Sequence, residues 1–320
     1  MSNAREIAQL GSVPSGRKNI IINGSHIVNQ RGLLPVTGVT SGYSATDRWK
    51  IYLTGVSANT ALTEDVLLSN GYYAKTLKAT ASSTATGALT FYQVVEDRNF
   101  EHLVGKTITA SVWMRSNNAN ARLFLWNNSA VIGTTAHTGG GGWEYLTVTA
   151  VITNSSTTLE CYAGIGDETN MGDVSVSSAD FVEFTQVQLE VGSVATEFEH
   201  RSYGEELALC QRYYTKFSFP QTTHFFPSHR QSTNNVRSTV TTPVPLRANP
   251  SINASGQPSL RYHWDNGSSF LDTSGTSLTV FSSGLDANRF TINNGNVTGV
   301  GANIGAVFAY SGYLECNAEL

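Results

Sequence analysis

Apolar and polar side chains alternate through much of the chain between residues 19 and 201, which predicts a succession of β-strands. The alternation is clearest from Thr107 to Arg115, where every second residue is apolar. A period of two places the two sets of side chains on opposite faces of a strand. The apolar set is Ile108, Ala110, Val112 and Met114, and the other set is Thr109, Ser111, Trp113 and Arg115.

The next strand repeats this pattern, with Leu123 and Leu125 opposite Arg122, Phe124 and Trp126. Further strands are expected where β-branched or aromatic residues are bounded by turn residues. These segments are 19–22, 48–55, 72–80, 87–94, 143–152, 157–163 and 181–190. Many short strands separated by Gly, Asn and Ser turns are typical of a sandwich or a jelly roll.

The pattern changes after the strand at 181–190. Gly192 breaks that strand, and the segment Glu205–Tyr214 contains strong helix formers with apolar residues at about helical spacing. Gly204 stands where a helix can begin. We therefore predict a short helix after the first β domain and a joint between two domains near residue 202.

Strands return after the predicted helix, and two Asn-Gly turns separate some of them. These strands are expected at 222–227, 235–244, 260–264, 277–281, 289–292 and 306–313. The complete prediction is an all-β chain: a jelly-roll β-sandwich followed by a short helix and a second, smaller β-sandwich. Its parts are an N-terminal arm at 1–18, the jelly-roll domain at 19–202, and the helix with the second sandwich at 203–320.

Composition narrows the classes of function. Charged residues make up 14% of the chain, and the formal net charge is −4. Nucleic-acid binding depends on clustered Lys and Arg, which this sequence lacks, so no nucleic-acid partner is expected. No apolar run reaches the ~18 residues of a membrane span, so membrane insertion is not expected. The three cysteines, Cys161, Cys210 and Cys316, have no metal-type spacing and are expected to be free and buried.

Side chains for catalysis or metal binding occur only in weak patterns. Adjacent carboxylates are found at Glu64-Asp65, Glu96-Asp97, Asp167-Glu168 and Glu205-Glu206. Glycoside hydrolysis requires two carboxylates held several ångströms apart, which adjacency does not establish. The loop Asp167–Asp173 offers oxygen ligands for Ca²⁺, and His224 and His229 offer imidazoles, but both patterns are more typical of polar loops and isolated histidines. We therefore predict no catalytic residue, no metal and no cofactor.

Aromatic side chains beside polar ones are the stronger binding signal, because a sugar ring stacks on a flat aromatic face while polar neighbours bond its hydroxyls. Trp113 and Trp126 fall on the polar-alternating faces of their strands. Each lies near an arginine, Arg115 or Arg122, so both are candidates for a saccharide platform on a face of the jelly roll. A second candidate is the run Tyr262-His263-Trp264-Asp265, which enters a turn. The alternative for both sets is that the rings pack in a core, at a strand end or between subunits.

Several motifs gather around the predicted joint. They are Gln186–Gly192 (QVQLEVG), Ala195–Glu199 (ATEFE), Glu206-Leu207 and Cys210–Tyr214 (CQRYY). Others are Asn19–Gly32, Tyr43–Trp49, Val240–Ile252 and the closing Leu314–Leu320. Together these segments resemble bacteriophage tail-fibre and prophage tail proteins. The segments Gly105–Trp113 and Trp143–Val148 are similar to strands of jelly-roll carbohydrate-binding modules.

The resemblance implies a non-enzymatic virion structural protein, assembled in the host cytoplasm, that acts as a tail fibre and binds host surface polysaccharide or lipopolysaccharide. Such fibres are generally homotrimers, so three copies of the predicted helix are expected to meet through Leu207, Cys210 and Tyr214. Residues 1–18 are expected to dock on other virion proteins. Two alternatives stay open: a head fibre or capsid decoration protein anchored by residues 1–18, and a polysaccharide depolymerase.

Overall fold

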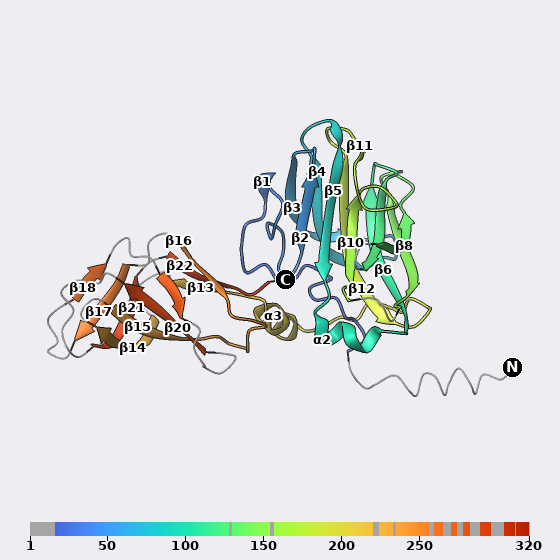
Figure 1. Cartoon of the computed structure of the whole chain (residues 1–320). Coiled ribbons are helices and arrows are strands. Elements are labelled where there is room, and N and C mark those ends of the chain that lie inside the picture. Colours follow the sequence, from blue (N-terminus) through green and yellow to red (C-terminus); the bar gives the residue numbers. More distant parts are fainter. Residues whose placement is uncertain are drawn as a thin grey trace. The chain divides into compact units, whose positions relative to one another are not determined.

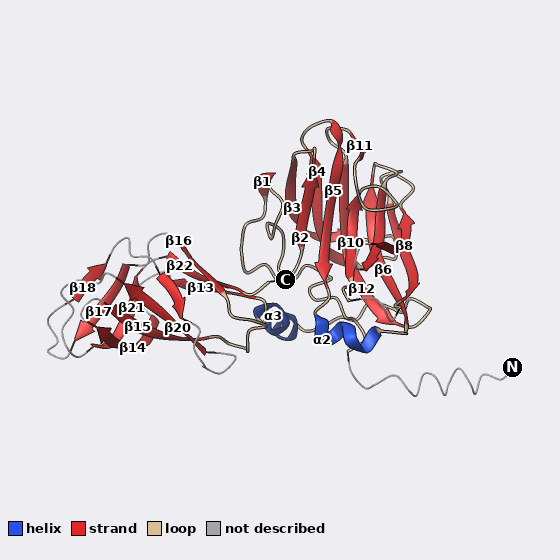
Figure 2. Ribbon diagram, viewed as in Figure 1, coloured by secondary structure: helices blue, strands red, loops and turns tan. Residues whose placement is uncertain are grey.

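The computed structural model shows an all-β chain, as predicted, in which the described strands pair antiparallel and the helices are short (Figure 2). The structure describes residues 17–127, 130–153, 157–219, 224–232, 235–255, 259–264, 270–273, 278–281, 289–295, 304–310 and 312–319. The chain divides into two compact units. The first contains the residues up to Ile27 together with Leu33–Arg201, and the second contains Val28–Gly32 together with the residues from Ser202 onward.

The first unit is a sandwich of two six-stranded sheets (Figure 1). One sheet has the order β1 (Val36–Val39), β3 (Ala58–Leu67), β4 (Tyr73–Ala81), β12 (Phe181–Val191), β6 (Thr107–Ser116), β9 (Trp143–Val151). The other has the order β11 (Val174–Val176), β5 (Ala85–Val94), β10 (Glu160–Ile165), β7 (Ala121–Asn127), β8 (Ala130–Ala136), and β2 (Lys50–Thr54) also pairs with β5. Helix α2 (Asp97–Phe100) and a 3₁₀ turn (Glu101–Leu103) connect β5 to β6. The chain crosses repeatedly between the sheets, for example from β4 to β5 and from β6 to β7, which gives the predicted jelly roll.

The apolar faces that the alternation predicted meet between the two sheets. Side chains from β6 and β7 are fully buried in one core: Ile108, Ala110, Val112, Met114, Leu123 and Leu125. Burying each large apolar side chain is worth roughly 1.5–3 kcal/mol, so this interior is the main source of stability for the unit. The three cysteines are free and buried, as predicted, and Cys161 belongs to this core.

Strand β12 changes its hydrogen-bonding partner part of the way along its length. Its first residues, Phe181–Phe184, pair with β4. Further along, the N-terminal segment takes the place of β4, and the Ile20 amide donates to the Leu189 carbonyl oxygen (2.8 Å). The Val187 amide likewise donates to the carbonyl oxygen of Gly24 (3.0 Å). The N-terminal segment therefore completes the sheet beyond the point where β4 ends its pairing.

The change of partner coincides with a β-bulge at Gln186, which has a φ of +53°. The extra residue shifts the alternation, because the core-facing residues are Val182 and Phe184 before the bulge but Val187 and Leu189 after it. The strand predicted at 181–190 is confirmed, and the bulge interrupts its alternation of core-facing and outward-facing residues.

Gly24 allows the N-terminal segment to approach the bulge closely. A Cβ atom at residue 24 would lie 2.1 Å from the carbonyl oxygen of Val187. A buried histidine packs nearby, and the ring of His26 lies 4.9 Å from that of Phe184. Burial lowers the pKa of His26 to about 3, so its imidazole is neutral at physiological pH and packs as an aromatic ring.

The second unit contains two further antiparallel sheets. One has the order β13 (Tyr214–Phe219), β22 (Gly312–Asn317), β16 (Ser251–Ser255). The other has the order β18 (Phe270–Thr273), β17 (Ser259–Trp264), β21 (Ile304–Tyr310), β14 (His224–Ser232), β15 (Asn235–Thr241), β20 (Arg289–Gly295), β19 (Leu278–Phe281). The single strand predicted at 306–313 is instead two strands, β21 and β22, that belong to different sheets.

Helix α3 (Tyr203–Gln211) opens the second unit. It begins one residue before the predicted Gly204, because Ser202 forms a capping box in which its hydroxyl and the side chain of Glu205 each bond the other's backbone amide. It ends before Tyr214, which lies in β13. No helix in the described ranges has the length and apolar character that crossing a membrane requires.

The predicted trimer axis is wrong for two of its three side chains. Cys210 is 0% exposed and Tyr214 is 2% exposed within the chain itself, so neither side chain is available to a second copy. The Tyr214 hydroxyl donates to the Glu315 carboxylate (2.6 Å), and the guanidinium of Arg31 lies 3.7 Å from the centre of its ring. Leu207 is half-buried. The homotrimer itself stays a prediction.

The short segment Val28–Gly32 packs as part of the second unit. Arg31 forms an ion pair with Glu319 (3.3 Å), and both side chains are almost fully buried. The Gln30 side chain donates to the Tyr214 carbonyl oxygen (2.8 Å), and Lys216 donates to the Arg31 carbonyl oxygen (3.1 Å). This segment is thus held by buried polar contacts. The predicted N-terminal arm lies outside the described residues except for Arg17 and Lys18.

Replacing Gly24 with alanine tests the close approach at the bulge. The new Cβ would meet a backbone oxygen, so Gly24→Ala is expected to lower the free energy of unfolding of the first unit by about 1–3 kcal/mol. Thermal unfolding of the full chain measures the change. Gly142→Ala is the matched control, because nothing lies within 4 Å of a Cβ there and its φ is not positive. Equal midpoints for the two variants would contradict the close approach.

Replacing Gln186 with glycine tests the strain at the bulge. A non-glycine residue at positive φ costs about 1–3 kcal/mol, so Gln186→Gly is expected to raise the thermal midpoint or leave it unchanged. Gln188→Gly is the contrast, because Gln188 lacks a positive φ and its amide donates to Glu190 (2.8 Å). That variant is expected to lower the midpoint. Equal destabilisation by both changes would show that the Gln186 side chain supports the fold.

Candidate functional site

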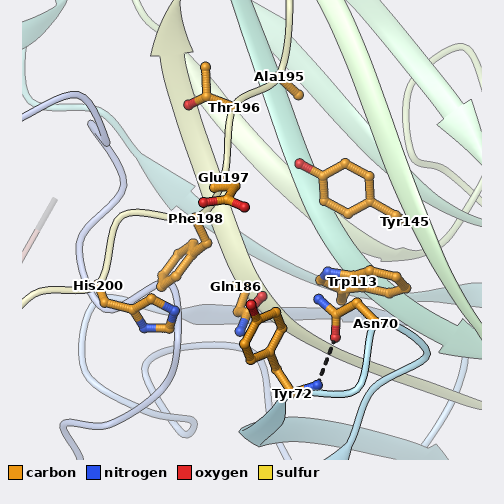
Figure 3. Close-up of a pocket in the computed structure, with 10 residues that line it drawn as sticks. All are labelled: Asn70, Tyr72, Trp113, Tyr145, Gln186, Ala195, Thr196, Glu197, Phe198 and His200. Carbon is orange, nitrogen blue, oxygen red and sulfur yellow. Dashed lines mark hydrogen bonds between the residues drawn. The ribbon is translucent and has the colours of Figure 1, made fainter.

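An open pocket of about 460 Å³ lies on the outer face of the first sheet, within the first unit (Figure 3). Its lining comes from strands β6, β9 and β12, from the turn between β3 and β4, and from the segment after β12. It includes Trp113, which the sequence predicted as a saccharide contact, and combines aromatic rings with a few polar groups.

Two aromatic rings from neighbouring strands form one side of the pocket. Trp113 of β6 and Tyr145 of β9 are register partners, and their ring centroids lie 5.2 Å apart at an interplanar angle of 44°. Trp113 points outward because Val112 and Met114, on either side of it, face the core. Tyr145 is 43% exposed, so much of its ring is accessible to a ligand.

Gln186 forms the floor between the aromatic walls, as Figure 3 shows. The residue as a whole is only 6% exposed, but its amide atoms are not among the fully buried, unpartnered atoms of the described residues, so they are accessible from the pocket. The bulge directs this side chain out of the sheet and into the pocket. An accessible amide offers both a donor and an acceptor to water or to a ligand. The floor is therefore prepared to form hydrogen bonds with a bound molecule.

The opposite wall is the segment after Gly192, which folds back across the sheet. The carboxylate of Glu190 accepts hydrogen bonds from the amide (2.8 Å) and the hydroxyl (2.7 Å) of Thr196. The side-chain oxygen of Gln188 accepts one from the Glu199 amide (2.8 Å). Gln188 and Glu190 are both buried, so the wall is fixed by charged and polar groups that sit on β12 itself.

The remaining lining supplies further rings and one carboxylate. Phe198 and His200 meet edge to face with their centroids 5.0 Å apart. Across the pocket, the Asn70 side chain accepts a hydrogen bond from the Tyr72 amide (3.1 Å), which Figure 3 marks with a dashed line. Glu197 is exposed and is the one carboxylate among the lining residues that the structure describes.

Both arginines predicted beside the tryptophans are engaged by carboxylates. The Nε and Nη2 atoms of Arg115 bond the Glu183 carboxylate at 2.8 and 2.7 Å. Glu183 is fully buried and also accepts the Thr76 hydroxyl (2.5 Å). The Nη1 atom of Arg122 lies 3.8 Å from Glu168. Saccharide binding by either arginine stays a prediction and would compete with these ion pairs.

Trp126 belongs to the second sheet and does not share a face with Trp113. It stacks on Phe124 with centroids 5.9 Å apart, and Phe124 meets Tyr162 edge to face at 5.8 Å. Tyr162 stacks in turn on Tyr92 at 4.8 Å. These rings are packed largely against one another. A common platform of the two tryptophans is therefore wrong, and a separate saccharide contact at Trp126 stays a prediction.

The binding roles predicted for residues of the second unit stay predictions. Tyr262, His263 and Trp264 form the end of β17, whereas Asp265 lies outside the described residues. His224 and His229 lie in β14. For Tyr262, His263, Trp264, His224 and His229, the structure describes the backbone but not the side chains.

In the loop considered for Ca²⁺, the carboxylates of Asp167 and Asp173 accept hydrogen bonds from protein groups. Asp167 accepts hydrogen bonds from the side chain and backbone of Thr169, which hold the pKa of Asp167 below its ordinary value. Asp173 accepts the Thr54 hydroxyl (2.5 Å). In the described residues, no three His, Cys, Asp or Glu side chains are grouped as metal ligands.

Sequence reasoning missed most of the pocket. Tyr145 falls on the outward positions of β9, so the alternation of that strand was a usable signal. Gln186 had a signal too, because the apolar positions move from even to odd numbers between Phe184 and Val187. The fold-back of the segment after Gly192 had none.

Comparisons with known proteins find structural similarity only. No known protein-family model matches the chain, and no curated protein matches its sequence. Solved structures with similar coordinates include the enzymatically active domain of tailspike protein 4 from bacteriophage CBA120, at 13% identity and a TM-score of 0.35. This similarity covers 54% of this chain but only 21% of that domain, so the chain spans about a fifth of the tailspike structure it matches.

Carbohydrate-binding modules are also among the similar structures. One is a family 61 module solved with β-1,4-galactotriose, at 11% identity, covering 55% of this chain and 100% of that one, with a TM-score of 0.32. Another is the family 11 module of a cellulosomal cellulase from Clostridium thermocellum, at 11% identity, covering 51% and 98%, with a TM-score of 0.32. Similarities this weak say nothing of what this chain binds.

Proposed function

We propose that the first unit binds saccharide in the pocket on the outer face of its first sheet, and that the protein is a virion tail fibre that uses this pocket at the host surface. The observation that carries the binding proposal is the pairing of the outward rings of Trp113 and Tyr145 with the accessible Gln186 amide. The virion role is supported by the resemblance of the joint segment to phage tail proteins.

The chemistry of the lining suits a sugar. A pyranose presents an apolar C–H face, which stacks on aromatic rings, and a rim of hydroxyls, which need hydrogen-bond partners. Trp113 and Tyr145 offer the rings, and Gln186 offers both a donor and an acceptor. Asn70 and Glu197 add polar atoms at the edge. A purely apolar ligand would leave the Gln186 amide without a partner.

Hydrolysis of the bound saccharide is less well supported than binding. Glycosidases place two carboxyl groups on either side of the scissile bond. Within the lining that the structure describes, Glu197 is the one carboxylate, and it lies exposed on the rim. The head-fibre alternative differs from a tail fibre in location on the particle and not in the chemistry of this pocket.

Affinity for one saccharide is expected to be modest because the pocket is open and few polar groups converge in it. Several linked copies that engage one cell surface raise the effective concentration for each further contact. A fibre with more than one binding unit would therefore adhere to a polysaccharide strongly although each pocket binds weakly. This is the mechanism that the proposal assigns to adsorption.

Removing one ring of the pocket tests the proposal. The full chain is applied to an array of bacterial surface glycans, and Tyr145→Ala is expected to weaken binding about two- to tenfold, since one aromatic stacking contact is worth about 0.5–1.5 kcal/mol. Tyr52→Ala is the matched control: it removes an equally exposed tyrosine (42% against 43%) from the other sheet. Loss of binding with Tyr52→Ala alone would move the site to the other face. No binding to any glycan would overturn the function.

A further inference from the structure

The pocket lining that the structure describes contains a negatively charged side chain but no lysine or arginine. Glu197 supplies the one carboxylate among these described residues. The other titratable groups of that lining are the imidazole of His200 and the phenols of Tyr72 and Tyr145. No ion pair joins Glu197 to a lysine or arginine in the described residues. The carboxylate of the rim therefore has no lysine or arginine partner within the described lining.

One cation, Lys18, bonds to the wall itself. The ammonium of Lys18 donates to the carbonyl oxygen of Glu197 (2.5 Å) and to the hydroxyl of Thr196 (2.7 Å). Neither acceptor is a carboxylate oxygen, so these two hydrogen bonds do not pair Lys18 with the Glu197 carboxylate. Lys18 thus holds the segment in place, and Figure 3 draws Glu197 between Phe198 and Tyr145 in the lining of the pocket.

Aromatic rings surround the same space. Trp113 and Tyr145 stand on one side, Phe198 on the other and Tyr72 at the lower edge of the view (Figure 3). The face of an aromatic ring is negative and attracts a cation within about 6 Å of its centre. Several rings and one carboxylate around one cavity form a setting that favours a positively charged group over a neutral group of the same size.

We propose that the pocket selects a saccharide that carries a free ammonium group, such as an amino sugar without an N-acetyl substituent. This inference rests on the proposed function and names the chemical class of its ligand. The ammonium lies against the rings and within reach of the Glu197 carboxylate, and the Gln186 amide bonds the hydroxyls of the sugar. N-acetylation removes the charge, so the acetylated sugar keeps only the stacking and the neutral hydrogen bonds.

A neutral saccharide is the competing ligand, because its hydroxyls can also donate to a carboxylate. The two cases differ in what Glu197→Gln does. Glutamine keeps a hydrogen-bond acceptor at that position but removes the charge. A neutral sugar is expected to lose little affinity, whereas an ammonium-bearing sugar loses its charge partner. Salt also screens the interaction of exposed charges, so the ammonium-bearing sugar alone is expected to bind more weakly at high ionic strength.

The test compares matched sugars on the full chain. Binding of glucosamine and galactosamine is measured by calorimetry or NMR titration beside that of their N-acetyl forms, at a mildly acidic pH that keeps the amines protonated. We expect a preference of about tenfold for the free amines, which Glu197→Gln abolishes. Glu101→Gln changes the net charge equally at an exposed position outside the pocket and is expected to preserve the preference. The same titration with His200→Gln is expected to preserve it too.

Equal affinity for the free and acetylated forms, or a preference that survives Glu197→Gln, overturns the inference and leaves saccharide binding standing. Failure of both forms to bind also overturns it, and the glycan array then decides the proposed function by itself. A preference lost with Glu101→Gln would show a general effect of net charge and would likewise overturn the assignment to Glu197.

Discussion

The structure of the first unit depends on the close contact between Gly24 and the bulge at Gln186. Strand β12 is central in its sheet and pairs with β6 along nearly its whole length. On its other edge β4 pairs for four residues only, and the N-terminal segment supplies the rest. That exchange requires backbone to approach backbone at a distance that excludes a Cβ atom at residue 24. The bulge therefore needs the N-terminal segment as its hydrogen-bonding partner, and the segment can pair there only because residue 24 is a glycine.

The same bulge builds the pocket. Without the extra residue, the even positions of β12 would continue into the core, and Gln188 and Glu190 would be buried there beside Phe184. With it, Val187 and Leu189 take the core positions, and the two polar residues turn to the outer face. There they bind the wall that contains Thr196. One backbone irregularity thus keeps polar groups out of the core, positions Gln186 and anchors the wall.

Much of this fold was predictable because it follows from local patterns. The alternation in β6 and β7 predicted their faces correctly, and the turn residues predicted most strand positions. The shift of apolar residues from Phe184 to Val187 was visible too, but its meaning depends on knowing that both faces of β12 are covered. What the sequence could not supply is long-range pairing: the use of residues 19–24 as a replacement for β4, the place of Val28–Gly32 in the second unit, and the fold-back that closes the pocket. These depend on contacts between residues far apart in the chain, which no local period encodes.

The residues of α3 limit how copies of the chain can associate. Cys210 and Tyr214 fill the interior of their own unit, and Arg31 covers the ring of Tyr214. Self-association through this helix must therefore use the face that stays accessible. Tyr203 is 59% exposed and Leu207, four residues later, is half-buried, so the two lie one above the other on the same face of the helix. The surface of this helix that a second copy can reach therefore contains Tyr203 and Leu207, in place of the set Leu207, Cys210 and Tyr214 expected for the homotrimer.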